Sequence, residues 1–242
     1  MPRLPDRWLK YSPYGGTIAD RFIALKVPLS AHYTGIPEAD RFTPTDAIET
    51  LSLGLIIDLT NTTRYYDPNE FTDNSVEYQK LFVKGHAIPE FSTVKRFLSI
   101  VKQFLRDPSS RGKYVGVHCT HGLNRTGYLV CAYLILELGY RAKDAIKLFN
   151  HKRGHEMERV NYLNSLYEME QSRKTLPGPR YRQTSPRGDP HSPRGDRRSP
   201  RGDRHNTPVI VSNPDHRYRR GHHPYSLHND RYQAMPKRTV FE

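Results

Sequence analysis

The chain has 242 residues, with 38 Lys and Arg against 25 Asp and Glu, a net charge of +13 and two cysteines. This length holds one domain of ordinary size plus an extension, and two cysteines exclude the disulfide framework of a small secreted protein. The first ten residues lack the apolar segment of a secretory signal. The longest apolar run, residues 128–136, is far shorter than the roughly 20 residues that span a bilayer. We therefore expect a soluble, intracellular, monomeric protein that does not bind membranes.

Strands and helices alternate along the first two thirds of the chain. Apolar alternation predicts a strand at 21–29, and Thr43, Pro44 and Gly54 have the order of cap, first helical residue and stop, which predicts a helix over 43–54. Further patterns predict strands at 55–60, 76–83 and 113–119, and helices at 90–105, 125–138, 142–153 and 158–170. This order predicts an α/β domain whose central, mostly parallel sheet is flanked by helices and binds ligands at the carboxyl ends of its strands.

The positive charge is concentrated after residue 171. Residues 1–171 hold 22 basic against 19 acidic residues, whereas residues 172–242 hold 16 against 6. The second segment also contains 10 of the 19 prolines, and the unit SPRGD recurs every seven residues, three times, between 185 and 205. Such a composition buries too little surface to offset its chain entropy. We predict a folded domain over 1–171 and a disordered basic tail over 172–242.

A disordered polycation gains affinity for nucleic acids because its basic side chains release counterions from the phosphates. We expect the tail to bind polyanions weakly, the alternative being a tail without a binding role. An adhesive role for the three RGD triplets would require an extracellular protein. Phosphorylation of Ser185, Ser192 and Ser199, which each precede proline, would reverse part of the charge.

The segment VHCTHGLNRTGYL, residues 117–129, leaves a predicted strand and enters a predicted helix. Free N–H groups and the helix dipole favour an anion at such a turn, and Gly122 and Gly127 let the backbone approach it closely. The same groups stabilise a thiolate, so Cys119 is the candidate nucleophile. Arg125 has a planar fork that fits two phosphoryl oxygens, and Thr126 offers the thiolate a hydroxyl. The spacing therefore indicates a phosphate site with an attacking sulfur.

The second cysteine and a histidine pair do not suggest another site. Cys131 lies in the apolar helix, where we expect it to pack in the core. His151 and His155 are one helical turn apart, but the alternating glutamates beside them share one face only in a strand, and the segment has helical spacing. We expect neither a metal nor a cofactor.

The loop HCTHGLNRTG, residues 118–127, resembles the signature loop of dual-specificity cysteine phosphatases. Together with GLIIDLTNTTRYYD (54–67), KGHAIP (84–89) and RGHEMERVNYL (153–163), it resembles more narrowly the metazoan RNA 5′-triphosphatases, over roughly residues 7–170. The resemblance implies the cysteine-phosphatase fold and a metal-independent reaction through a cysteinyl-phosphate intermediate. The implied substrates are RNA 5′-triphosphate and 5′-diphosphate ends, from which the γ and then the β phosphate are removed. A dual-specificity protein phosphatase, acting on phosphotyrosine, phosphoserine or phosphothreonine, is the alternative.

The resemblance also implies roles for the loop residues. Cys119 would be the nucleophile and Arg125 the transition-state clamp. The phosphate would lie in a cradle made of Thr120, His121, Gly122, Leu123, Asn124 and Arg125. A nuclear location follows, with the cytoplasm as a second one, and ribonucleoprotein proteins become candidate partners of the tail.

Supporting residues remain open at this stage. The usual acid of these phosphatases is an aspartate some thirty residues before the cysteine; here Glu90 is the nearest carboxylate, and it reads equally as a first-turn helix residue. Asp58, at the end of a predicted strand, either orients Arg125 or a water, or caps the following turn. Candidate contacts to the outer phosphates or the RNA backbone, otherwise surface arginines, are Arg64, Arg153 and Arg159.

Overall fold

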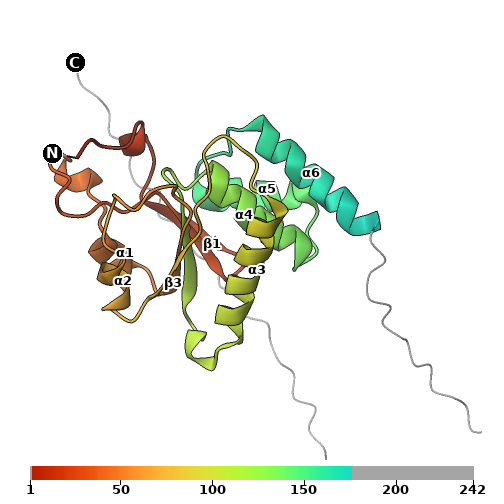
Figure 1. Ribbon diagram of the computed structural model, residues 1–242, viewed down its shortest axis with the longest axis horizontal. Helices are drawn as coiled ribbons and strands as arrows, with labels where there is room; N and C mark the ends of the chain where they lie inside the picture. The colour runs from red at the N-terminus through yellow and green to blue at the C-terminus, as the bar shows by residue number, and fades with distance from the viewer. Residues whose placement is uncertain (1, 176–242) are drawn as a thin grey trace, which may run out of the picture. The chain divides into compact units, whose positions relative to one another are not determined.

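The computed structural model describes residues 2–175, whose strands form one sheet in the order β1-β2-β5-β3-β4 (Figure 1). The strands are β1 (Tyr14–Ile18), β2 (Phe22–Leu25), β3 (Leu53–Asp58), β4 (Glu77–Lys80) and β5 (Tyr114–His118). Strand β1 pairs antiparallel with β2, and the other neighbours in the sheet are parallel. The predicted α/β architecture with a mostly parallel sheet is confirmed.

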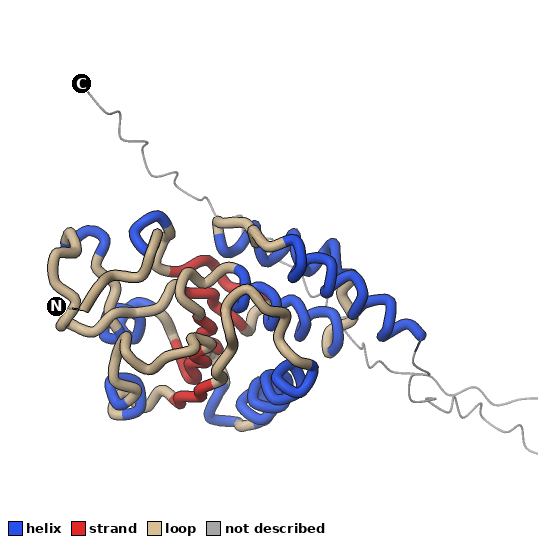
Figure 2. Tube along the Cα trace, turned by 45° about the horizontal axis from the view of Figure 1, so that its top comes forward, coloured by secondary structure: helices blue, strands red, loops and turns tan. Residues whose placement is uncertain are grey.

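Helices cover both faces of this sheet (Figure 2). They are α1 (Pro44–Thr50), α2 (Asn69–Thr72), α3 (Phe91–Arg106), α4 (Asn124–Leu136), α5 (Ala142–Arg153) and α6 (Val160–Thr175), with short 3₁₀ helices at Trp8–Lys10, Glu38–Asp40 and Pro108–Ser110. One apolar core lies under α3 to α6, and a second, which includes Trp8, Phe42 and Phe71, lies on the side of α1 and α2. Within the described range, no helix is long and apolar enough to cross a membrane.

The start of α1 was predictable, but its end was not. Thr43 and Asp46 form a capping box in which Thr43 Oγ1 accepts from Asp46 N at 3.2 Å, and Pro44 is the first helical residue. The prediction that Gly54 ends this helix is wrong, because the helix ends at Thr50 and Gly54 lies in β3. A Cβ at Gly54 would lie 2.6 Å from Phe104 Cζ, so glycine permits close packing against α3.

Strand β1 was not predicted. Its sequence, YGGTI, contains two glycines, which usually indicate a turn. A Cβ at Gly15 would collide with the carbonyl oxygen of Lys152, near the end of α5. The glycine is needed because α5 crosses the strand closely, which is a tertiary cause that the local sequence does not contain.

The parallel strands bring their carboxyl ends together around the loop that follows β5. On one side Leu59 N donates to His118 O at 2.8 Å, and on the other Val27 N donates to Thr120 O at 3.2 Å. The base of the loop is therefore fixed by extensions of both neighbouring strands.

Helix α6 continues to Thr175, past the predicted domain boundary at residue 171. The three SPRGD repeats lie outside the described residues. The division into a domain over 1–171 and a tail over 172–242 stays a prediction.

Candidate active site

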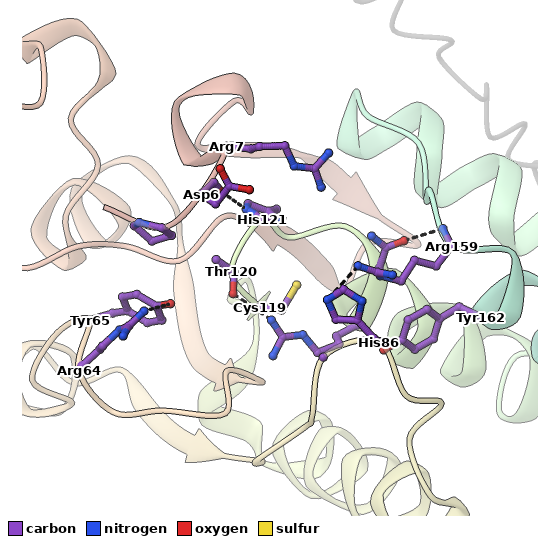
Figure 3. Close-up of a pocket in the computed structure, with 14 residues that line it drawn as sticks. Asp6, Arg7, Arg64, Tyr65, His86, Cys119, Thr120, His121, Arg159 and Tyr162 are labelled. Atoms are coloured by element: carbon purple, nitrogen blue, oxygen red, sulfur yellow. Dashed lines mark hydrogen bonds between the residues drawn. The ribbon is translucent and has the colours of Figure 1, made fainter. Parts of the chain in front are cut away.

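A cavity of about 340 Å³ opens at the carboxyl ends of the strands (Figure 3). Its walls come from residues 5–7, 64–65, 85–86, the loop after β5, and residues 159 and 162. Cys119, Thr120, His121, Asn124 and Arg125 all line it. The structure thus brings together the predicted nucleophile and most of the predicted cradle.

Gly122 sets the shape of this loop. Its φ of +67° is a left-handed conformation, and a Cβ there would collide with the carbonyl oxygen of Leu25. Gly127 has a different role from the one predicted: it lies in α4, where a Cβ would be 2.6 Å from Met157 Sδ. Phe149 of α5 would lie 2.8 Å away, so Gly127 permits close packing of α4 against α5 and the segment after it, rather than close approach of the backbone to an anion.

The remaining cradle residues anchor the loop to its surroundings. Leu123 is buried beside the start of α4. Asn124 Oδ1 accepts from the backbone N–H groups of Glu158 and Arg159, at 2.9 and 3.0 Å. His121 Nε2 lies 2.6 Å from the carbonyl oxygen of Asp6, and because a carbonyl only accepts, Nε2 carries the proton.

Cys119 is buried at the base of the cavity, and its thiolate is favoured. Burial, the largest single influence, raises the pKa of Cys119. The charge of Arg125, the Thr126 hydroxyl, and the N–H groups of Thr126 and His121 together lower the pKa below its usual value. Thr126 Oγ1 is buried and bonds to no other group of the described chain, so its proton is available to the sulfur.

We expect iodoacetamide to modify Cys119 and to leave Cys131 unmodified in the folded protein. The lowered pKa of Cys119 leaves more thiolate at neutral pH, whereas burial raises the pKa of Cys131 inside α4. The alkylation rate of Cys119 should therefore reach its plateau at a lower pH than that of an ordinary thiol. Peptide mass spectrometry across a pH series measures both sites, and preferential labelling of Cys131 would contradict the prediction.

The Arg125 side chain is held in place by three elements. Its Nη1 donates to the carbonyl oxygens of Leu59 at 3.2 Å and Val83 at 2.9 Å, and its Nη2 donates to Thr120 Oγ1 at 2.9 Å. The guanidinium is thus fixed beside Cys119 by the chain after β3, the chain after β4 and the loop itself. Such an arrangement suits a phosphoryl group in transfer, because the donors need little reorganisation.

The prediction that Arg153 contacts RNA is wrong. This arginine is 1% exposed, and Nε and Nη2 donate to the carbonyl oxygens of Gly122 and His121, each at 3.1 Å. Further bonds at 2.8 Å join it to Ser12 Oγ and to the Ser12 carbonyl. Burial lowers the pKa of Arg153 to about 10. Arg153 therefore supports the loop from behind.

We expect Arg153→Met to lower both the free energy of unfolding and kcat. The change leaves the buried carbonyls of His121 and Gly122 without this donor, and an unpaired buried polar group costs about 1–3 kcal/mol. Urea denaturation and assays with an aryl phosphate measure the two effects. Arg141→Met, at the exposed start of α5, is the matched control, and equal stability of the two variants would contradict the supporting role.

For Asp58, the structure contradicts one of the two roles that the sequence suggested. Its Oδ1 accepts from Thr60 N and Oγ1, both at 2.7 Å, and its Oδ2 accepts from Lys80 Nζ at 2.6 Å and Tyr78 Oη at 3.0 Å. No hydrogen bond joins it to Arg125 among the described residues. The alternative interpretation, a carboxylate that caps the turn after β3, is the one that the structure supports.

Glu90 does not reach the cavity. It is exposed immediately before α3, and its carboxylate accepts from Ser92 Oγ at 3.2 Å. In the same loop His86 lines the cavity, and sequence reasoning missed it. The available signal was the segment KGHAIP, which carries part of the resemblance and places a histidine in the loop where the usual acid of these phosphatases lies.

Two predicted arginines and one unpredicted arginine line the cavity. Arg64 lies over the ring of Tyr65, and Arg159 Nη2 donates to His86 Nε2 at 3.2 Å. Arg7, which sequence reasoning did not single out, has a φ of +55° and pairs with Glu158 at 3.2 Å. Together with Arg125, these side chains make the cavity cationic.

The described residues contain no cluster of three or more His, Cys, Asp or Glu side chains placed to hold a metal ion. Of the histidine pair considered for a metal, His155 Nε2 instead accepts from Ser12 N at 3.1 Å. The site therefore consists of a thiol with a lowered pKa, a fixed arginine and an anion-binding loop.

This fold and this site define a cysteine-type phosphatase. Residues 38–172 match the family model "Dual specificity phosphatase, catalytic domain", so the chain belongs to the dual-specificity phosphatase family. The crystal structure of Tk-PTP in the active form superposes with a TM-score of 0.53 at 20% identity, covering 66% of this chain and 97% of the other, which shows the shared fold.

Within the family, the chain is similar to proteins named for an RNA-protein complex. It is 44% identical over 186 residues to the Caenorhabditis elegans "RNA/RNP complex-1-interacting phosphatase homolog", covering 71% of this chain and 78% of the relative. It is 45% identical over 170 residues to the human "RNA/RNP complex-1-interacting phosphatase", covering 67% and 51%. The chain thus spans about half the length of the human relative, and the predicted resemblance to dual-specificity cysteine phosphatases is confirmed.

Proposed function

We propose that the chain is an RNA 5′-phosphatase that removes the γ phosphate, and then the β phosphate, from triphosphate-ended RNA. In this reaction Cys119 attacks the terminal phosphorus to form a cysteinyl phosphate, Arg125 binds the equatorial oxygens, and water then releases phosphate. No step requires a metal.

The observation that carries this proposal is the set of arginines in the cavity beyond the catalytic loop. The loop and Arg125 suffice for one phosphoryl group, whereas Arg7, Arg64 and Arg159 line the same cavity. A polyphosphate end needs such cations for its inner phosphates, whereas a phosphoamino acid has no inner phosphates. The relatives named RNA/RNP complex-1-interacting phosphatase support RNA as the substrate class, because those names state an interaction with an RNA-protein complex.

The leaving group provides a second support. A tyrosine side chain has a pKa of about 10 and needs a proton to leave, whereas a diphosphate end leaves as a weakly basic anion. Glu90, the carboxylate nearest the expected position of the acid, does not line the cavity. A site without a carboxylic acid in that loop suits anhydride cleavage better than ester cleavage.

One assay separates this function from a dual-specificity protein phosphatase, the alternative that family membership favours. RNA labelled at the γ or the β phosphate and a phosphotyrosine peptide are each incubated with the enzyme in EDTA, and the released phosphate is resolved by thin-layer chromatography. We expect γ and then β release at a kcat/KM well above that for the peptide. A preference for the peptide would reject the proposal, and activity restored only by magnesium would reject the metal-independent mechanism.

We extend the proposal in two ways. The basic tail binds RNA, and the protein is located in the nucleus, where transcripts with triphosphate ends arise. Truncation after Thr175 should leave the rate on a short triphosphate oligonucleotide unchanged, since the cavity lies within the described domain. Full-length protein should bind long RNA more tightly at low salt, with a slope of about 0.7 per contacted phosphate in a plot of log affinity against log salt. Binding isotherms at several salt concentrations measure this difference. Equal affinities of the full-length and truncated proteins for long RNA at low salt would contradict a role of the tail in RNA binding.

A further inference from the structure

The second half of a cysteine-phosphatase reaction needs a base, whatever group left in the first half. Water must attack the cysteinyl phosphate, and a side chain that takes its proton speeds this step. Among the residues that line the cavity, the groups able to do so are Asp6, His86 and His121.

His121 is engaged elsewhere. Its Nε2 carries a proton and donates it to the carbonyl oxygen of Asp6. The bond makes the His121 ring a link between the loop and the N-terminal segment. Its Nε2 therefore offers no lone pair to a water, which leaves only Nδ1 of this ring as a competing base, and His121→Asn tests it below.

His86 is in the opposite protonation state at Nε2. The atom lies 3.2 Å from Arg159 Nη2, and because a guanidinium only donates, Nε2 must present its lone pair. In the structure His86 thus presents at Nε2 the lone pair that a base needs. When Arg159 turns toward the oxygens of the phosphoryl group held in the loop, that lone pair becomes free in the cavity.

The backbone around His86 is held in an unusual conformation. Its φ is +71°, which a residue other than glycine adopts at a cost. Asn161 Nδ2 donates to the His86 carbonyl at 3.0 Å, and Tyr162 Oη donates to the Ala87 carbonyl at 2.8 Å. Two bonds from α6 therefore hold the backbone that carries the ring, and Figure 3 shows the ring among the residues around Cys119.

We propose that His86 is the general base that hydrolyses the cysteinyl phosphate. The water oxygen bonds to phosphorus, the phosphorus–sulfur bond breaks, and Cys119 Sγ leaves as the thiolate. The water proton passes to His86 Nε2, and the imidazolium then returns it to solvent. This assignment rests on cysteine-phosphatase chemistry and does not depend on RNA as the substrate.

The test is pre-steady-state kinetics of His86→Asn with p-nitrophenyl phosphate. Asparagine tolerates a positive φ, so the variant keeps the backbone conformation. We expect a burst of nitrophenol close to one per enzyme, followed by a steady-state rate about 10²–10⁴-fold below that of the wild type. Acid quenching with ³²P-labelled substrate should then trap a phosphoenzyme that the wild type accumulates far less, and added imidazole should restore part of the slow rate.

Three control variants make the outcome decisive. His32→Asn changes an exposed histidine outside the cavity and should behave as the wild type. Asp6→Asn and His121→Asn test the two competing groups: accumulation of phosphoenzyme in either variant and not in His86→Asn would transfer the role to that residue. A slower burst without trapped phosphoenzyme would place His86 in the first step, and unchanged kinetics would remove it from the mechanism. Either result overturns the proposal.

Discussion

The Cys119→Ser variant should release no phosphate above roughly 10⁻⁴ of the wild-type rate, the scale seen when a catalytic nucleophile is removed. The serine hydroxyl keeps the shape of the side chain but is not ionised at neutral pH. Arg125, Thr126 and His121 lower the pKa of a thiol at this position. The same groups cannot bring an alcohol, whose pKa is far higher, into the ionised range.

Binding should survive this change, because the N–H groups of the loop and the Arg125 guanidinium remain. Kinetics with an aryl phosphate and calorimetry with inorganic phosphate measure the two properties separately. Cys131→Ala is the control, since it removes the other thiol from the core of α4. Turnover by Cys119→Ser within tenfold of the wild type would reject the covalent mechanism.

The Arg125→Lys variant should lose about 3–4 kcal/mol of transition-state stabilisation, the scale of losing one preorganised oxyanion donor. An ammonium group carries the same charge but lacks the planar fork. It also cannot bond simultaneously to Val83 and Thr120 in the arrangement that fixes the guanidinium. The loss should fall mainly on kcat, because a lysine still attracts the ground-state phosphate.

Orthovanadate, which adopts the geometry of a phosphoryl group in transfer, offers an independent measurement. Its inhibition constant should rise in parallel with the loss in kcat/KM, while the inhibition constant of inorganic phosphate should rise less. Arg96→Lys, on the exposed face of α3, is the matched control. A rate near that of the wild type in Arg125→Lys would place the clamp elsewhere.

The sequence predicts best what is decided within one short segment. The capping box of α1 is local, and so is the strand-to-helix turn that holds Cys119, Gly122 and Arg125. Alternation of strands and helices also defined the parallel sheet, because parallel neighbours need crossover connections between them. These features require no knowledge of which distant segments meet.

The rest depends on distant segments. Arg153 reads as a surface residue because arginine is rarely buried, yet Ser12, His121 and Gly122 together supply it with acceptors. His86 reads as a loop residue, and only the bonds from α6 place it in the cavity. Burial and orientation of a charged or polar side chain follow from the assembled fold.

The first turn of α6 gives the site a thermodynamic dependence on the end of the described domain. Residues 158 and 159, just before this turn, bond to Asn124 at the start of α4, and residues 161 and 162 bond to the carbonyls of His86 and Ala87. A sub-global opening that detaches α6 would release these anchors while the sheet stayed intact. Enzymatic activity therefore reports the docking of this helix, and by linkage a bound phosphate slows amide hydrogen exchange in its first turn.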